Sequence, residues 1–497
     1  MTSLLPSLYS GFEHVLTPAV LLTMLIGSIA GIIVGALPGI GPAVAISVML
    51  PATFGMPPII GLTVLLAIYC GSWYGGAVPA ILINTPGTPS AAITTFDGYP
   101  MARAGAAQRA ICIAFTSSFV GGMLSVVSLV LFAPLLVQLA RSFGAPEYLL
   151  ALLMALALVL FALRDRVVEG ALMLALGLAI STVGLDPNTM TERYTFGVTE
   201  LYNGLPLIPV VVGLFGVAQG FVLLDRHALG VDATRIDPGT VSLAGVVEVF
   251  RYWKTLLKSS LIGITVGALP GIGVETSGLF AYAEARRASS DPASFGKGNP
   301  EGVVASESAN NAVTGAAMVP VLALGIPGDA ITALIMGVFI IHNIFPGPQL
   351  FAEQPQLVSG IFASMFLMNI MIFLILLFSA RYVAKLAEIP PGPLSVGILL
   401  LSFIGAYSVA NNFANVWIAL IAGIFGYVAR RLGLPIVGLM LGIILGPLIE
   451  ERLRQTLSIG QGSIGYIVER PISLAMIAAI LMIVALSVVR AIRERRS

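Results

Sequence analysis

The sequence predicts an all-α membrane protein of about a dozen helices, built from two related halves whose helices are broken at Pro-Gly motifs. The composition and a duplicated motif lead to this prediction. Of the 497 residues, 57% are hydrophobic and 10% are charged, whereas ordinary soluble domains carry roughly 25% charged residues. A soluble core has no room for so much apolar surface, so the chain is expected to lie in a bilayer.

Apolar stretches of spanning length recur along the whole chain. A helix needs roughly 20 mostly apolar residues to cross a hydrocarbon core about 30 Å thick. The apolar stretches are residues 16–37, 107–140, 145–163, 168–184, 205–224, 356–380, 392–409, 413–429, 432–449 and 471–489. Backbone polar groups in lipid must pair within their own segment, which favours helices. The runs are continuous, unlike the short alternating strands of a membrane barrel.

Charge and cysteine content exclude several other classes of protein. The net charge is +1, which provides no basic face, so no nucleic-acid partner is expected. Cys70 and Cys112 lie in or beside apolar segments, where small buried residues are a better interpretation than a disulfide or metal site. No cofactor is predicted. The N-terminus lacks the basic flank and cleavage site of a signal peptide, so the first apolar segment is expected to remain as a membrane helix.

An internal repeat is the most informative feature. GIIVGALPGIG at Gly31–Gly41 returns as GITVGALPGIG at Gly263–Gly273 with one difference. VPAILINTPG from Val78 is matched by VPVLALGIPG from Val319, with the same spacing between the two prolines. A repeat of this kind indicates two halves with one plan.

The spacing of the repeats locates the two halves. The first pair of motifs is offset by 232 residues and the second by 241, so the second half carries nine extra residues between its motifs. They coincide with the polar stretch Arg286–Glu301. We therefore predict a first transmembrane repeat at residues 1–240 and a second at residues 241–497.

Arg and Lys in short loops predict how the halves are oriented, because they favour the cytoplasmic side. Arg103 and Arg109 follow the first TPG motif, which places that loop inside. The loop 346–356 after the matching IPG holds only Glu353, and the segment Asp186–Asn203 is mostly acidic, so both are expected outside. The repeats are therefore predicted to be inverted, an arrangement that places a site near the bilayer midplane between two gates.

The Pro-Gly motifs have a physical logic. Pro removes a helix donor and Gly permits open backbone, so the motifs at Pro38, Thr85 and Ile326 should break helices. Broken helices are tolerated where the freed backbone lines a protein-buried or watery cavity, and the N–H groups of a half-helix suit a carboxylate. A packing kink is the alternative, since Gly27, Gly31 and Gly35 also form a close-approach face. The duplication favours a functional role.

Candidate ligands lie beside these breaks. We predict substrate binding by backbone and side-chain groups of Gly39, Gly41, Asn84, Thr85, Gly87, Thr88, Asn310, Asn311, Gly325 and Gly328. Carboxylates at membrane depth are costly, so Glu275, Glu307 and Asp329 are candidates to carry a coupling Na⁺ or H⁺. Asp329 is the best placed, one residue beyond the IPG break. Alternatively, Glu275 and Glu307 face water beside the polar insertion and Asp329 caps a half-helix.

Three motifs together resemble a known family. They are the GALPGIG pair, NTPG followed by DGYPMARAG, and EGVVASESANNAVTGAAMVPVLALGIPG. The chain is similar over nearly its whole length to the large membrane subunit of tripartite tricarboxylate transporters, the TctA family. The resemblance carries over to the positions Pro38–Gly41, Asn84–Gly87, Asn310, Asn311 and Gly325–Gly328. Glu275 departs from the small residues expected after the second PGIG.

The resemblance implies a function and partners. It implies a multi-pass solute transporter of the bacterial inner membrane that is energised by an ion gradient. A small TctB-like membrane subunit and a periplasmic TctC-like solute-binding protein, which delivers a carboxylate, are the implied partners beside the lipid bilayer.

Two other classes of membrane protein are alternatives. An intramembrane aspartyl protease needs two facing Asp residues, but Ile326–Asp329 lacks the glycine of a GxGD motif, and neither HExxH nor GxSxG occurs. No enzyme is therefore predicted. A passive channel stays open as an alternative, and it would show flux without ion coupling.

Overall fold

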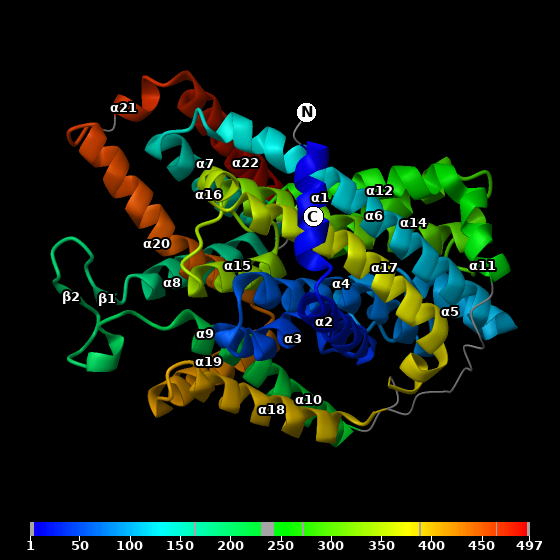
Figure 1. Ribbon diagram of the computed structural model, residues 1–497. Coiled ribbons are helices and arrows are strands. Elements are labelled where there is room, and N and C mark those ends of the chain that lie inside the picture. Colours follow the sequence, from blue (N-terminus) through cyan, green and yellow to red (C-terminus); the bar gives the residue numbers. More distant parts are fainter. Residues whose placement is uncertain are drawn as a thin grey trace.

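The protein is almost entirely helical in the computed structural model, which describes residues 4–163, 166–229, 243–270, 273–386, 389–463 and 465–494 (Figure 1). The strands in this part of the chain form one short antiparallel pair, β1 (Gly184–Leu185) and β2 (Glu192–Arg193). The predicted all-α membrane fold is confirmed. The predicted boundary between the halves at residue 240 lies outside the described residues.

Each of the ten apolar stretches predicted from the sequence coincides over most of its length with helix. The helical segments before residue 240 are α1 (Leu4–Val15), α2 (Pro18–Ala36), α3 (Gly41–Met49), η1 (Leu50–Gly55), α4 (Pro58–Ile83), η2 (Pro89–Ala92), α5 (Thr95–Met101), η3 (Ala102–Ala106), α6 (Ala107–Ala140), α7 (Ala145–Ala162), α8 (Val167–Ser181), η5 (Thr199–Leu201), α9 (Leu207–Val211), η6 (Val212–Val217) and α10 (Ala218–Leu229). Those after it are α11 (Leu243–Glu248), η7 (Val249–Tyr252), α12 (Trp253–Ala268), α13 (Val274–Ala288), η8 (Pro292–Ser294), α14 (Pro300–Leu324), α15 (Ala330–Ile341), α16 (Pro348–Glu353), α17 (Pro355–Leu386), α18 (Pro391–Ser408), α19 (Phe413–Arg431), α20 (Ile436–Ile459), α21 (Gly465–Val468) and α22 (Pro471–Glu494).

The helices that can span a bilayer differ in their surroundings. In the described part of the chain, eight are long and apolar enough to cross, and four shorter apolar helices accompany them, which agrees with the predicted dozen. For α4, 89% of the spanning window is buried inside the protein, against 17% for α18 and 28% for α19. Leu401 and Trp417 are among the exposed apolar side chains of these two helices, whose outer faces suit contact with lipid.

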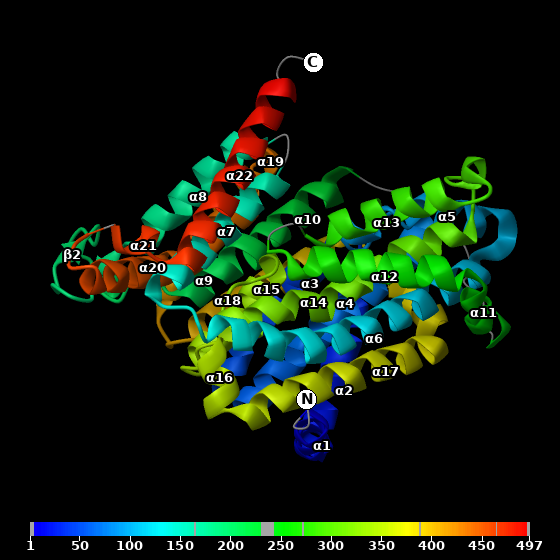
Figure 2. The same cartoon turned by 90° about the horizontal axis from the view of Figure 1, so that it is seen from above.

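Helices α4 and α14 occupy the interior of the bundle (Figure 2). α4 packs on α2 and α17, and α14 packs on α6 and α12. Glycine permits the close approach: Gly31 and Gly35 of α2 lie against the α4 backbone, and Gly263 and Gly267 of α12 lie against the α14 backbone. The close-approach face that the sequence suggested for α2 is therefore real, and α12 repeats it.

In the first half, the chain turns back at both of its Pro-Gly motifs. Gly27 of α2 packs on Val64 and Gly35 packs on Ser72, so α2 and α4 run in the same direction. The chain must return along α3 to begin α4. Beyond the end of α4 it turns back again, because the Gly87 N–H donates to the Gly76 carbonyl at 3.3 Å, about two turns before the helix ends.

The second half repeats this path. Gly263 and Gly267 of α12 pack on Ala309 and Val313 of α14, which again makes the two helices parallel. After α14 ends, Gly328 lies against Ala317, two turns back along the helix. In each half, therefore, the second Pro-Gly tip returns to the middle of the long helix.

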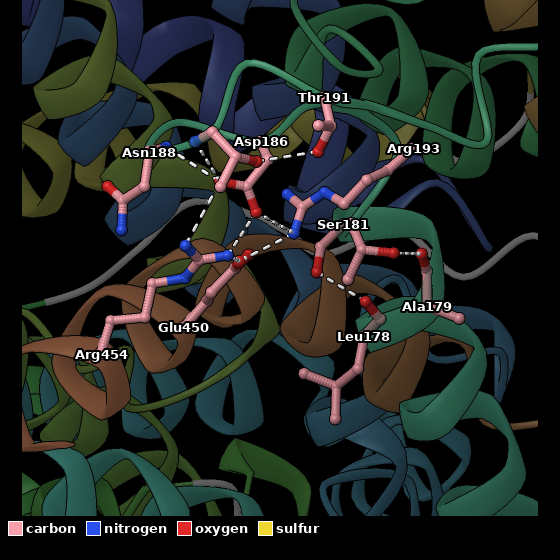
Figure 3. Close-up of polar contacts among 11 residues, drawn as sticks. Leu178, Ala179, Ser181, Asp186, Asn188, Thr191, Arg193, Glu450 and Arg454 are labelled. Carbon is pink, nitrogen blue, oxygen red and sulfur yellow. Dashed lines mark hydrogen bonds and ion pairs between the residues drawn. The ribbon is translucent and has the colours of Figure 1, made fainter. Parts of the chain in front are cut away.

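A charged cluster holds the β1–β2 loop to α20 (Figure 3). Arg193 lies 2.7 Å from Glu450 and 3.5 Å from Asp186, and Arg454 binds both of these acids. Asp186 also accepts the Asn188 N–H at 2.9 Å. Hydrogen bonds from Arg454 and from neighbouring backbone N–H groups lower the pKa of Asp186. The segment that was predicted to lie outside is thus an ordered turn fixed by ion pairs.

Candidate functional site

The first PGIG motif breaks the helix as predicted. α2 ends at Ala36 and α3 begins at Gly41, with positive φ angles of 84° at Gly39 and 68° at Gly41 that glycine adopts without strain. The Gln219 amide donates to the Gly39 carbonyl at 2.6 Å, and Arg430 in turn donates to Gln219. A guanidinium therefore lies one side chain away from this break.

The TPG and IPG breaks share one backbone geometry. Pro79 lies inside α4, and its carbonyl accepts the Thr85 N–H at 3.3 Å after the left-handed residue Asn84. In α14, Pro320 accepts from Ile326 at 3.2 Å after the left-handed residue Gly325. All three positions differ by the 241 residues of the sequence repeat. The duplicated sequence therefore encodes a duplicated turn.

The glycines at the two tips are packed tightly. A Cβ at Gly87 would overlap the Gly35 carbonyl and the Gly76 Cα. A Cβ at Gly328 would press on Ala317. Gly41, by contrast, has open space where its Cβ would point. Packing alone therefore requires glycine at both tips, whatever these backbone groups bind.

Polar side chains meet where the segment 88–101 returns past α14. The Thr94 hydroxyl donates to Glu307 Oε1 at 2.5 Å and lies 3.0 Å from the Ser306 hydroxyl. Ser118 of α6 donates to Glu307 Oε2 at 2.9 Å. Glu307 is 0% exposed. An ionised carboxylate at such a site costs several kcal/mol unless a cation or further donors compensate it.

Two amides continue this polar face of α14. Asn310 follows Ser306 and Glu307 by one turn, so its side chain lies directly beside theirs on the helix surface. It is 1% exposed, and among the residues that the structure describes neither its Oδ1 nor its Nδ2 has a hydrogen-bond partner. Oδ1 of the buried Asn311 is also unpaired. Each buried polar group left unpaired destabilises the fold by about 1–3 kcal/mol. A ligand that hydrogen-bonds to these amides would recover part of this free energy.

Asp97 fixes the end of the same segment. Its Oδ1 accepts backbone N–H groups from Gly296, Gly298 and Asn299 at 2.8–2.9 Å, and its Oδ2 accepts the Tyr282 hydroxyl at 2.7 Å. These donors belong to α13 and the polar insertion of the second half. The returning segment of the first half is therefore bound to the insertion through Asp97.

The equivalent interface, α15 against α4, is mostly apolar. Its acid, Asp329, caps α15: Oδ1 accepts the Thr332 N–H at 2.6 Å and the Thr332 hydroxyl at 2.8 Å. Oδ2 accepts the Tyr69 hydroxyl of α4 at 3.1 Å. Elsewhere Val338 packs near Gly61. The capping geometry that the sequence offered as the alternative for Asp329 is therefore present.

The structure separates the candidate residues into groups. Thr88 starts the turn η2, which packs on α4, α13 and α14, so it joins Glu307, Asn310 and Asn311 at one buried interface. Asp329 belongs to the other interface. The side chains at the turn itself are less enclosed: Asn84 is exposed, and Thr85 donates to the Ile83 carbonyl. The Glu275 side chain lies outside the described residues, although its backbone belongs to α13.

Four residues of these interfaces were not selected from the sequence. They are Thr94, Asp97, Ser118 and Tyr69. Asp97 is the first residue of the motif DGYPMARAG, so the motif could have identified it as a candidate. Thr94 and Ser118 are ordinary hydroxyl residues in sequence and become informative only through their contact with Glu307.

Comparisons with known proteins agree with this geometry. The family described as Tripartite tricarboxylate transporter TctA family matches residues 21–441. An uncharacterized 52.8 kDa protein in the TAR-I ttuC' 3'region of Agrobacterium vitis is 37% identical over 498 residues, covering 100% of this chain and 98% of the relative. An uncharacterized protein in the TAR-II ttuC' 3'region of the same organism is 38% identical over 234 residues, covering 47% of this chain and 97% of the relative. No solved structure matches.

The family match spans both sets of Pro-Gly breaks and the polar interface between them. The helices, their apolar faces and this match agree on one assignment. The chain is a multi-pass membrane protein that belongs to the tripartite tricarboxylate transporter TctA family.

Proposed function

We propose that the chain is the permease subunit of a binding-protein-dependent secondary transporter. It imports a carboxylate, either tricarboxylate-like or another organic acid, and a gradient of Na⁺ or H⁺ drives the import. The observation that carries the proposal is the buried polar interface beside α14, where Asn310 and Asn311 have unpaired amide atoms. Broken helices around a buried polar centre are the arrangement in which secondary transporters bind substrate and ion.

The proposed substrate contacts follow from carboxylate chemistry. A carboxylate only accepts hydrogen bonds, and Asn310 Nδ2 is a buried donor without a partner. The buried Thr88 hydroxyl, 3.3 Å from that of Ser90, adds a further donor. The N–H groups of Gly87 and Ile326 at the Pro-Gly turns already donate within the protein, so a substrate would contact them only if the turns open. Helix N-termini carry about half a positive charge each, so an anion with two or three charges requires further neutralisation, which the driving cation supplies.

The proposal includes an inverted relation between the two halves. Gly61 of α4 lies near Val338 of α15, and Gly302 of α14 lies against Asp97. Gly302 is 241 residues after Gly61, and Asp97 is 241 residues before Val338, so the two contacts exchange partners between the halves. A two-fold axis between residues 1–240 and 241–497 produces such an exchange, and loop charge favours an axis in the membrane plane.

Cysteine labelling tests this relation. Ala104 and Ala352 follow corresponding motifs and are both exposed. Single cysteines placed at these two positions should react with an impermeant reagent from opposite faces of the membrane. Labelling of both from one face would make the repeats parallel and remove the two-gate interpretation.

The proposed partners and location extend the family assignment. The family description names a tripartite system, which supports a small TctB-like membrane subunit and a periplasmic TctC-like solute-binding protein beside this chain. We place the complex in the bacterial inner membrane, with the carboxylate delivered from the periplasmic side.

Uptake measurements test the function. Vesicles with the full complex are given labelled citrate, succinate and acetate under separate Na⁺ and pH gradients. Accumulation of one carboxylate against its own gradient, dependent on one ion, is the expected result. Equilibration without ion dependence would favour the passive channel. Consumption of the solute without uptake would favour an intramembrane enzyme.

A further inference from the structure

Glu307 joins three elements that must move relative to one another if the site opens. Its two oxygens accept Thr94 of the returning segment 88–101 at 2.5 Å and Ser118 of α6 at 2.9 Å, while the residue itself belongs to α14. These two hydroxyls are its hydrogen-bond donors among the described side chains. A change of charge on this one carboxyl group therefore acts directly on the contact between the returning segment and α14.

No positive charge reaches Glu307 from the side chains that the structure describes. On α4, Tyr74 faces the carboxyl group, but its hydroxyl donates to Asn369 at 2.8 Å. On the returning segment, Asp97 is already bound by Tyr282 and three backbone N–H groups. The neighbouring titratable groups are thus neutral or acidic, and none of them can compensate a carboxylate.

Asp329 provides the internal contrast. It accepts a backbone N–H and a hydroxyl from Thr332 and a third hydrogen bond from Tyr69. It also lies at the N-terminus of α15, where the helix dipole stabilises negative charge. Three donors and the helix dipole therefore stabilise its charge, whereas Glu307 lies inside α14 and has two hydroxyl donors.

We propose that Glu307, Thr94, Ser118 and Ser306 form the binding site of the driving monovalent cation, and that its occupancy controls docking of the segment 88–101 on α14. This inference rests on the proposed transport function and assigns the coupling site within it. The cation is either Na⁺ or H⁺, and both act by neutralising the same carboxylate.

The oxygen atoms at this position suit both cations. Carboxylate and hydroxyl oxygens are the ligands that hard cations prefer, and Ser306 adds a third hydroxyl 3.0 Å from that of Thr94. A proton would bind to one Glu307 oxygen, and the new O–H would donate to a hydroxyl oxygen of Thr94 or Ser118. In either case a buried charge is removed without breaking the contact between the three elements.

The neighbouring amide explains how ion and substrate would be coupled. Asn310, whose side chain is unpaired, follows Glu307 by three residues and so lies beside it on α14. A substrate carboxylate at Asn310 would be repelled by an ionised Glu307 and accepted once a cation neutralises it. Thermodynamic linkage makes the effect reciprocal, so bound substrate also raises the affinity for the cation.

Direct ion binding to the purified chain tests the site without knowledge of the substrate. Labelled Na⁺ binding and the infrared carboxylic-acid band at acidic and alkaline pH are measured for the parent, Glu307→Gln and Asp329→Asn. We expect one of these two signals in the parent, its loss in Glu307→Gln and its retention in Asp329→Asn. Retention in Glu307→Gln, or loss only in Asp329→Asn, would overturn the assignment.

A milder pair of variants covers the case in which Glu307→Gln does not fold. Thr94→Val removes the hydroxyl at nearly constant shape, and Thr94→Ser restores it. Removing one hydrogen bond to a charged group should weaken the apparent ion affinity of citrate uptake about tenfold or more. Thr94→Ser should recover most of it. Equal ion affinity in Thr94→Val and the parent contradicts a role for Thr94.

Different results would contradict the transport function and the assignment of the cation site. If the parent complex shows no ion-driven uptake of any carboxylate, the transport function itself is wrong, and this inference falls with it. If the parent is ion-driven and Glu307→Gln keeps the same ion dependence, only the site assignment is wrong.

Discussion

The two interfaces between returning segments and long helices have the same backbone plan but different chemistry. Where the segment 88–101 meets α14, hydroxyls, amides and two buried acids lie together. Where α15 meets α4, the contact is mostly apolar, and Asp329 accepts from Tyr69 and Thr332. The Nε2 atom of His342, near Gly61, has no hydrogen-bond partner among the described residues. A duplicated scaffold has therefore kept its turns and packing while its polar groups have concentrated on one side.

The comparison distinguishes the residues that the helix breaks require from the residues that are available to bind a ligand. Glycine is needed at the tip of each interface, because Gly87 and Gly328 both pack against a helix backbone. The unpaired Asn310 and the uncompensated Glu307 occur at only one. The polar interface is the candidate for chemistry, and the apolar one is the candidate for a rigid support.

The largest effects are expected at the two tips. Gly87→Leu and Gly328→Leu should each abolish uptake, because the side chain overlaps the Gly35 carbonyl or Ala317. Overpacking of this kind costs about 1–3 kcal/mol or more, so both variants should also melt earlier in detergent. Gly397→Leu on α18 is the matched control, because a Cβ at Gly397 meets open space and its φ is not positive. Normal uptake in either tip variant would refute the tight packing.

Asn310→Leu separates function from stability at the polar interface. Removing an unpaired buried amide should leave stability unchanged or raise it by about 1 kcal/mol, while uptake of citrate falls at least tenfold. Asn369→Leu is the matched control, because Asn369 accepts from Tyr74 and donates to the Met365 carbonyl. It should lower stability instead. If Asn310→Leu were as destabilised as Asn369→Leu, Asn310 would have a structural role.

Substitutions of Asp329 by Asn and by Ala test the role of the apolar interface. Asn is as good an N-cap as Asp, whereas Ala costs about 1 kcal/mol, so Asp329→Asn should melt close to the parent and Asp329→Ala should melt earlier. Ion dependence of uptake should stay that of the parent in Asp329→Asn. A loss of ion dependence in this variant would restore Asp329 as the coupling acid that its sequence position suggested.

The smallest effect is expected far from both interfaces, in the cluster of Asp186, Arg193, Glu450 and Arg454. Arg454 lowers the pKa of Asp186 in the folded state, so folding keeps this group ionised. The contribution is full above the ordinary Asp pKa of about 3.9 and is lost as the pH falls through the lower folded value. Melting curves over acidic pH should therefore converge for the parent and Asp186→Asn, with uptake unchanged. A constant difference at every pH would contradict the ion-pair explanation.

The apolar stretches predicted from the sequence include the helices that face lipid but omit α4, the spanning helix most enclosed by protein among the described residues. α4 carries glycines, Ser72 and Tyr74 along faces that contact α2, α17 and α14, but its mean hydropathy of 1.5 equals that of α19 and exceeds the 1.4 of α18. It was absent from the ten predicted stretches, although 89% of its spanning window is buried. Mean hydropathy does not follow burial in this protein, since the span Leu207–Asp225 is 78% buried with a mean hydropathy of 2.3 and α18 is 17% buried with 1.4. The omitted helix therefore had to be found by its packing.

The sequence by itself determined the membrane class, the two halves and the positions of the breaks, because apolar length and Pro-Gly chemistry act locally along the chain. It also marked Asn310 and Glu307 as polar residues in an apolar context. Only the tertiary structure decided which donors surround each acid. The hydroxyl donors of the two acids lie 189 to 260 residues away in sequence; they are Thr94, Ser118 and Tyr69. The cost of a buried negative charge depends on such neighbours in space, which the local sequence does not reveal.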